Sequence, residues 1–273
     1  MRLGIEAGAH TLDVAVEHGI KGVPVSAERL VSLGLEAALA PLRERGLSIC
    51  QIGAFGFNPL SPDKARQAEQ RRILETAIPL TAQTGCPYLV ICGGNYDVAA
   101  FARADQRNFT NEALDEIAHE LEPLLHMAEL HGAKIAIELY LKTAVNSAER
   151  FLALWERLRS DALCANVDVT SLYTYADIWD PLPLARRTCE LLAGHYGLVH
   201  IKDVALQDGF HIHIDLAPIG AGVTDWQALL PFFESHIPED SWAILEHVKT
   251  PAEARLSLEN LRAAAQAAGI RLA

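Results

Sequence analysis

The sequence predicts an α/β protein that forms a single (β/α)8 TIM barrel over residues 1–273. Short apolar runs alternate with longer amphipathic stretches every ~30 residues, which is the length of one strand–helix unit. Eight such units close a barrel, and the chain has the usual length for that fold. A doubly wound open sheet is the main alternative. It is disfavoured because no GxGxxG motif follows the first apolar run.

The predicted strands are apolar runs that end in turns or polar residues. They cover residues 2–8, 20–25, 47–55, 87–94, 134–140, 163–169, 197–204 and 242–248. Gly46, Gly85 and Gly132 each stand just before one of these runs and indicate turns that end the preceding helices. Four other residues have the spacing of helix N-caps, namely Ser61, Asn146, Thr224 and Thr250.

Composition limits the class of partner. Lys and Arg total 23 and Asp and Glu total 35, so the net charge of −12 repels phosphate backbones and argues against nucleic acid. No apolar stretch is long enough for a transmembrane helix, and the first residues lack a signal-peptide pattern. We therefore expect neither a membrane nor a nucleic acid as partner.

The cysteines indicate a reducing compartment. There are five, and no pair has CxxC spacing, which is typical of reduced thiols in a cytoplasmic protein. We expect them to be small buried core residues. They are Cys50, Cys86, Cys92, Cys164 and Cys189.

Four candidate metal ligands stand late in the last four predicted strands: Glu138, Asp168, His200 and Glu246. Catalytic groups of a barrel lie at the carboxyl ends of its strands, so these side chains should converge. Three carboxylates at such short range would repel one another unless a cation were bound. Carboxylates with one imidazole suit Mn²⁺, Mg²⁺, Co²⁺ or Zn²⁺, so we expect one divalent metal ion as cofactor.

The stretch "LVHIKDV" (198–204) places polar side chains in an apolar strand. His200 and Lys202 share one face because side chains alternate. Lys202 either holds a substrate oxygen or forms a salt bridge with a ligand carboxylate, while Asp203 orients a neighbour or caps a loop. His247 follows Glu246 and is expected to pack on the helix side. For Glu6, the sequence leaves open whether it faces the mouth or the bottom of the barrel.

Several segments in order resemble a known family. "GAFGFNPLSPD" (53–63), "IELY", "NVDVTS", "HIKDV", "HIDLAPIGAGVTDW" (213–226) and "AILEHV" are similar to segments of the xylose isomerase-like TIM-barrel superfamily. That superfamily contains sugar phosphate isomerases and epimerases as well as AP endonucleases of the endonuclease IV type. The resemblance implies that the four ligands bind one metal. It also implies that Glu138 and Glu246 form the catalytic acid/base pair, which moves a proton through an enediolate.

Two positions depart from the family pattern. Ser171 stands where many members have His, and Ala144 stands where keto-sugar epimerases have a second Glu. These departures argue against a free-ketohexose 3-epimerase and favour a polyol, a sugar acid or a keto-glycoside. The candidate substrate-binding residues are Lys202, His213, Ser171 and Asn95.

The resulting prediction is a cytoplasmic, metal-dependent isomerase or epimerase of carbohydrate metabolism that acts on a small sugar or sugar derivative. The main alternative is a lyase or dehydratase on a keto-sugar, keto-polyol or keto-glycoside, because the same enediolate can expel a β-hydroxyl. A non-catalytic sugar-binding barrel is a further alternative. A DNA-repair enzyme would need several His ligands on the early strands, where His10 stands alone. Members of the superfamily often pair, so a homo-oligomer stays open.

Overall fold

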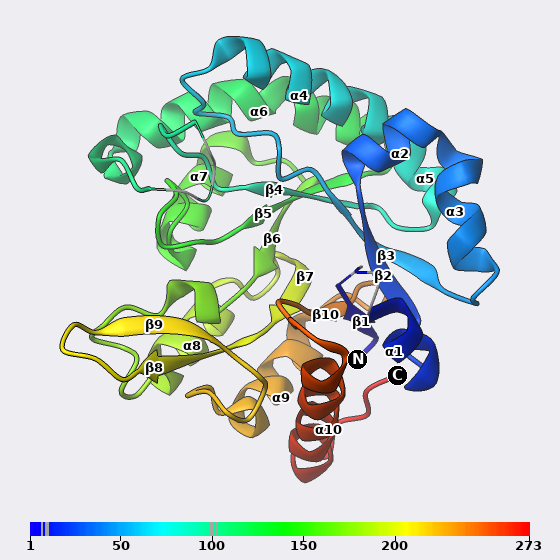
Figure 1. Ribbon diagram of the computed structural model, residues 1–273. Helices are drawn as coiled ribbons and strands as arrows, with labels where there is room; N and C mark the ends of the chain where they lie inside the picture. The colour runs from blue at the N-terminus through cyan, green and yellow to red at the C-terminus, as the bar shows by residue number, and fades with distance from the viewer. Residues whose placement is uncertain (7, 9–10, 99–100, 102) are drawn as a thin grey trace.

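Eight parallel strands form a closed barrel within the part of the chain that the computed structural model describes, residues 1–6, 8, 11–98, 101 and 103–273 (Figure 1). The strand order around the barrel is β1-β10-β7-β6-β5-β4-β3-β2. These strands are β1 Leu3–Ile5, β2 Gly22–Ser26, β3 Ser48–Gly53, β4 Tyr88–Cys92, β5 Lys134–Glu138, β6 Leu163–Val167, β7 Tyr196–Ile201 and β10 Ala243–Leu245. The predicted (β/α)8 barrel is confirmed, and each predicted strand overlaps an observed one, although β2 and β7 each extend one residue beyond the predicted run.

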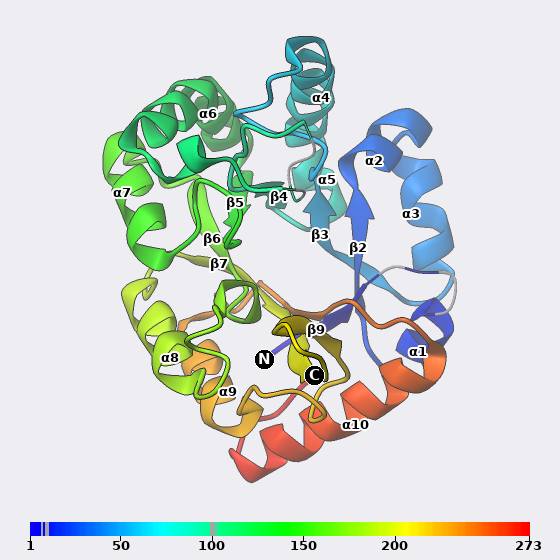
Figure 2. The same cartoon turned by 60° about the vertical axis from the view of Figure 1, so that its left-hand side comes forward.

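Helices surround the barrel on its outer side (Figure 2). They are α1 Thr11–Glu17, α2 Ala27–Leu33, α3 Leu35–Arg43, α4 Lys64–Ala77, α5 Thr81–Thr84, α6 Asn111–His131, α7 Ala148–Leu158, α8 Leu182–Leu191, α9 Trp226–His236 and α10 Pro251–Ala267. Among the described residues, no helix combines the length and apolar character needed to cross a membrane.

The barrel strands are mostly apolar because both of their faces are covered. All residues of β4 and of β7 are buried, for example. Such strands pack side chains into the barrel interior on one face and against helices on the other. The five cysteines are also buried, as expected for small core residues.

The first and last barrel strands close the ring. β1 pairs with β10 in parallel, with Ile5 opposite Leu245, and β1 also pairs with β2. At the other end of β1 the two termini meet, where Ala273 N donates to Met1 O at 3.0 Å (Figure 1). Residues from both ends of the chain therefore build the same wall of the barrel.

A β-hairpin that was not predicted follows the seventh barrel strand. The expected run 197–204 breaks at Lys202, after which β8 (Asp203–Gln207) and β9 (His213–Ala217) pair antiparallel outside the barrel (Figure 1). His213 therefore lies in a strand that is not among the predicted strands. Asp208-Gly209 between two alternating apolar runs is a recognised hairpin signal that could have found it.

Of the four expected N-caps, only Thr250 is confirmed, at the start of α10. The other three predictions lie one or two residues too early. Asp63 caps α4, Ser147 caps α7 and Asp225 caps α9. Each of these loops offers two good side-chain acceptors within two residues of each other, so the backbone path of the loop decides which one reaches the free amide.

Candidate active site

Four strand ends bring the expected metal ligands together. Glu138 is the last residue of β5, Asp168 follows β6, His200 lies in β7 and Glu246 follows β10. Each of these side chains offers a ligand atom, and the four atoms all lie within 4.8 Å of one another. Glu138, Asp168 and His200 are buried, while Glu246 is partly exposed at the mouth.

The register of the strands explains this convergence. Glu138 lies beside Asn166 of β6, and His200 lies beside Ile244 of β10. Neighbouring parallel strands are ~4.8 Å apart, so inward side chains at similar heights come into contact. The cluster is therefore a direct result of where each polar residue stands in its strand.

Two cations compensate the three carboxylates. Lys202 Nζ contacts Asp168 Oδ2 and lies 3.9 Å from Glu138 Oε1. His200 Nδ1 lies 2.9 Å from Glu246 Oε2 and 3.5 Å from Glu138 Oε1. The salt-bridge alternative for Lys202 is thus observed, and its contact with a substrate stays a prediction.

These contacts determine the charge of each group. Burial alone would raise the pKa of both Asp168 and Glu246. Instead, the positive charges of Lys202 and His200 lower the pKa of Asp168, and His200 lowers the pKa of Glu246. Burial opposes the charge on His200, yet Glu246 and Glu138 raise its pKa to about 10. In the same way, Asp168 outweighs burial and raises the pKa of Lys202. Asp168 and Glu246 are therefore ionised at neutral pH and able to bind a cation.

Two residues around the cluster escaped sequence reasoning. Gln51 of β3 accepts a hydrogen bond from His200 Nε2 at 2.7 Å, which directs Nδ1 toward the carboxylates. Asn166 Nδ2 lies 3.0 Å from His200 Nδ1, and its Oδ1 is buried without a hydrogen-bond partner among the described residues. Gln51 and Asn166 are each a polar residue inside an apolar run, and this pattern could have indicated them as site residues.

Asp168 is held by the turn that follows it. Thr170 Oγ1 donates to Asp168 Oδ1 at 2.8 Å, and Ser171 Oγ donates to Asp168 Oδ2 at 2.8 Å. Ser171 therefore orients the carboxylate of a candidate ligand. Ser171 also lines the neighbouring cavity, so a contact with substrate stays a prediction.

A cavity of about 630 Å³ opens beside the ligands, between the loops after β5 and β6 and the β8–β9 hairpin. Its walls include Lys202, Ser171, His213 and Tyr173. A second cavity of about 540 Å³ reaches Glu246 from the side of β1 to β3. Three of the four expected substrate-binding residues thus line one cavity, whose volume suits a small molecule.

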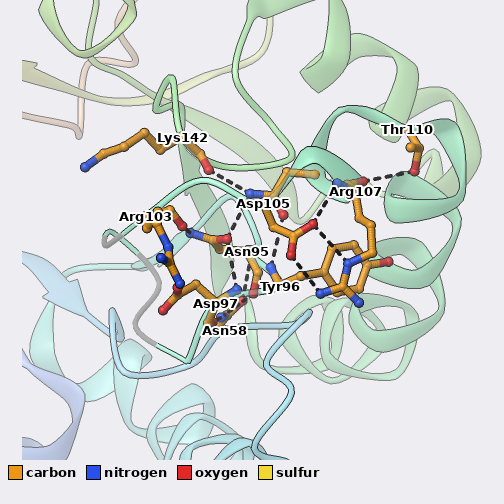
Figure 3. Close-up of polar contacts among 10 residues, drawn as sticks. Asn58, Asn95, Tyr96, Asp97, Arg103, Asp105, Arg107, Thr110 and Lys142 are labelled. Carbon is orange, nitrogen blue, oxygen red and sulfur yellow. Dashed lines mark hydrogen bonds and ion pairs between the residues drawn. The ribbon is translucent and has the colours of Figure 1, made fainter.

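Asn95, the fourth expected substrate-binding residue, is fully buried in a network of amide side chains (Figure 3). Asn58 Nδ2 donates to Asn95 O at 2.7 Å, and Asn95 Nδ2 donates to Arg103 O at 3.2 Å. Asn108 Nδ2 bridges Asn95 Oδ1 and Lys142 O, each at 2.8 Å. These bonds join the loops after β3, β4 and β5, so Asn95 holds the mouth of the barrel together.

The structure also shows the contacts of Asp203 and the orientation of His247. Asp203 accepts hydrogen bonds from the backbone of Val204, Gly220 and Thr224, and it therefore anchors the hairpin and the loop before α9. His247 was expected to pack against helices, and this was wrong. Its side chain is exposed and lines the large cavity, because β10 ends at Leu245 and alternation stops there. His10 lies outside the described residues.

The donor set fits a divalent metal ion. It consists of three carboxylates and one imidazole, which are the ligands that Mn²⁺, Co²⁺ and Zn²⁺ accept and Mg²⁺ accepts in part. His200 also has the partner that metal-bound imidazoles usually have on their second nitrogen, here Gln51. Glu138, Asp168, His200 and Glu246 could therefore hold one ion.

Comparisons with known proteins agree with the fold. The family model described as "xylose isomerase-like TIM barrel" matches residues 10–264. The chain resembles the 3-keto-D-glucoside 4-epimerase of E. coli with 18% identity and a TM-score of 0.71, covering 96% of this chain and 99% of that one. It resembles a xylose isomerase-like TIM-barrel protein of Mycobacterium smegmatis in complex with magnesium with 14% identity and a TM-score of 0.71, covering 94% of this chain and 88% of that one.

A third similar structure is that of the probable 3-DHS dehydratase of Bacillus anthracis, with 14% identity and a TM-score of 0.71, covering 96% of this chain and 98% of that one. No curated protein matches the sequence. At identities this low, the structural similarity establishes the shared fold alone. The reaction has to be argued from the site.

Proposed function

The chain belongs to the xylose isomerase-like TIM-barrel family, and we propose that it is a divalent-metal-dependent isomerase or epimerase of a small sugar or sugar derivative. The observation that carries the proposal is the cluster of Glu138, Asp168, His200 and Glu246 beside a cavity large enough for such a substrate. A bound divalent ion would supply Lewis acidity, which polarises a carbonyl and stabilises developing negative charge.

Glu138 and Glu246 are proposed as the acid/base pair. They come from β5 and β10, which β6 and β7 separate in the barrel, so their carboxylates approach the cluster from different sides. One carboxylate removes the proton next to the substrate carbonyl, and the other returns a proton to the opposite face or to the neighbouring carbon. The lowered pKa of Glu246 keeps it ionised, which suits the role of base.

Lys202 is proposed to stabilise the enediolate. Its ammonium lies at the boundary between the cluster and the cavity, where it contacts Asp168 and lines the cavity wall. A fixed positive charge in a buried site stabilises a developing oxyanion more strongly than it would in water. His213 and Ser171 line the same cavity and are proposed to contact substrate hydroxyls.

The cavity favours a sugar derivative over a free monosaccharide. Tyr140 and Tyr175 line it in addition to the polar residues, and Lys142 stands among them. Aromatic and cationic side chains beyond the ligand cluster offer contacts for a substituent on the sugar ring. We therefore propose a keto-glycoside, polyol or sugar acid as the substrate class.

Dehydration is the second candidate reaction. Lys202 Nζ contacts the ligand Asp168 and faces the cavity, so it is placed to protonate a leaving β-hydroxyl of the same enediolate. The probable dehydratase of similar fold makes this alternative worth testing. Product analysis separates the two reactions, since only dehydration changes the substrate mass.

Metal content is the decisive first measurement. Protein purified without chelator should contain stoichiometric divalent metal, and the Glu246→Gln variant should lose most of it. Glu253→Gln is the matched control, because Glu253 lies in the first turn of α10 and accepts a hydrogen bond from Lys249 N outside the cluster. Keto-sugars, sugar acids and keto-glycosides are then screened for hydrogen exchange in heavy water. Absence of metal after reconstitution would contradict the proposal and favour a non-catalytic sugar-binding barrel.

A further inference from the structure

We propose that Glu6 is a positioning residue that holds the turn after Glu246 and thereby aims Glu246 at the other three ligands. The inference deepens the proposed function and rests on it for the identity of Glu246 as a ligand. It assigns a role to a carboxylate that the reaction itself does not use.

The evidence begins with two hydrogen bonds. Glu6 Oε2 accepts from His247 N at 2.7 Å, and Glu6 Oε1 accepts from Val248 N at 2.9 Å. The two oxygens of one carboxylate thus bind two successive amides directly after a ligand. Within the part of the chain that the structure describes, the Glu6 carboxylate forms no ion pair. Its hydrogen-bond partners there are these two amides.

The turn that Glu6 holds has an unusual backbone. His247 has a φ of +56°, and Arg159 is the other non-glycine residue with positive φ in the described part of the chain. Side chains with a Cβ rarely adopt this conformation, and it persists where surrounding contacts enforce it. The paired acceptors of Glu6 are the contact that can enforce it here.

The rest of the backbone around Glu246 is already held. Glu246 N donates to Ile201 O at 3.0 Å on one side, and Glu6 N donates to Leu245 O at 2.9 Å on the other. β1 and β10 lie side by side (Figure 1), and Glu6 and Glu246 directly follow the paired residues Ile5 and Leu245. The backbone of Glu6 is anchored in turn by Thr11 Oγ1, which donates to Glu6 O at 2.5 Å. What Glu6 adds is control of the direction in which the chain leaves Glu246.

The first test is the affinity for Mn²⁺ alone, measured by calorimetry on the full chain. Glu6→Ala should raise the Kd about 10-fold, as expected when a residue that orients a ligand is removed. Glu6→Gln keeps one acceptor and should fall between that variant and wild type. Glu253→Ala is the matched control: its carboxylate accepts from Lys249 N at 2.8 Å in the same loop, and its removal should leave the Kd unchanged.

The second test isolates the backbone conformation. His247→Gly and His247→Ala both remove the imidazole, but only glycine adopts positive φ readily. In the Glu6→Ala background, the glycine variant should therefore bind Mn²⁺ more tightly than the alanine variant. Equal Kd values in these two double variants would overturn the role of the turn.

A metal-free readout separates this inference from the proposed function. His200 Nδ1 lies 2.9 Å from Glu246, so its imidazole ¹⁵N resonances should shift in Glu6→Ala and stay in place in Glu253→Ala. If wild type bound no Mn²⁺, the proposed function would fail, and the His200 resonances would still decide the role of Glu6. Unchanged resonances and an unchanged Kd in both Glu6 variants would overturn the inference.

Discussion

Lys202 shows at the residue scale how the negative charge of the clustered carboxylates is compensated. Its ammonium is buried and contacts Asp168, and it lies 3.9 Å from Glu138. The Lys202→Met variant leaves these carboxylates without that compensation. We expect the free energy of unfolding, measured in urea with chelator, to fall by about 3–5 kcal/mol, as for a broken buried ion pair.

Mn²⁺ provides the check on this interpretation. Because a bound cation would compensate the same carboxylates, it should recover more stability in Lys202→Met than in wild type. Lys134→Met is the control, since Lys134 lies on an exposed site where Nζ donates to Asp161 O at 3.1 Å. Equal losses in the two variants would argue against a compensating role for Lys202.

The cysteines are a second residue-scale case. Burial raises the pKa of Cys86, Cys92 and Cys164 to about 12, and it raises the pKa of Cys189 to about 11. Because the thiolate is the reactive form, a raised pKa leaves little of it at pH 8. We expect no rapid labelling of the native protein by a disulfide reagent at pH 8, and labelling of all five thiols in denaturant. Rapid native labelling would indicate an exposed thiol.

At the element scale, α7 tests how a helix start is chosen. Ser147 Oγ accepts from Arg150 N at 3.3 Å, whereas the neighbouring Asn146 makes no cap bond to the helix. Ser147→Ala should therefore lower the free energy of unfolding by about 1 kcal/mol. Asn146→Ala should lower it by clearly less in the same urea titration. A larger loss of stability in Asn146→Ala than in Ser147→Ala would show that Asn146 is the N-cap, as the sequence analysis predicted.

The β8–β9 hairpin is the element that most changes the site. It brings His213, Ile214 and Leu216 to the wall of the large cavity, although it follows the barrel strand that carries His200. Its strands pair with each other and not with the barrel. Part of the cavity wall therefore comes from an element that is separate from the barrel strands, which bring the four candidate ligands together.

At the scale of the whole molecule, an ion pair joins the first helix to the last. Arg255 Nη2 of α10 lies 2.8 Å from Glu17 Oε2 of α1. The hydrogen bond from Arg255 lowers the pKa of Glu17 below its usual value of 4.5. A lowered pKa in the folded state means that the pair stabilises the fold above pH 4.5 and stops doing so as the pH falls through the lowered pKa.

Glu17→Gln should accordingly lower the Tm slightly at pH 7, and the difference from wild type should shrink as the pH falls below 4.5. The effect should be small because both side chains are exposed. In an Arg255→Gln background, Glu17→Gln should have no further effect on the Tm. A difference in Tm that persisted in acid would assign the effect to something other than this charge.

The sequence by itself determined the barrel and which four candidate ligand side chains meet at its mouth. Periodic apolar runs locate the eight strands because each strand is covered on both faces. Since barrel strands end at one mouth, polar residues late in four runs had to meet there, as Glu138 and Asp168 do. Both conclusions depend only on local pattern and on the geometry of a closed parallel sheet.

Only the tertiary structure decided what surrounds those ligands. Gln51 reaches His200 across 149 residues of sequence, and Glu6 reaches the His247 amide across 241. No local pattern encodes such contacts, because they depend on barrel closure bringing distant strand ends side by side. The positive φ of His247 could not be predicted for the same reason: histidine itself does not favour it, and Glu6, which we propose enforces it, is distant in the sequence.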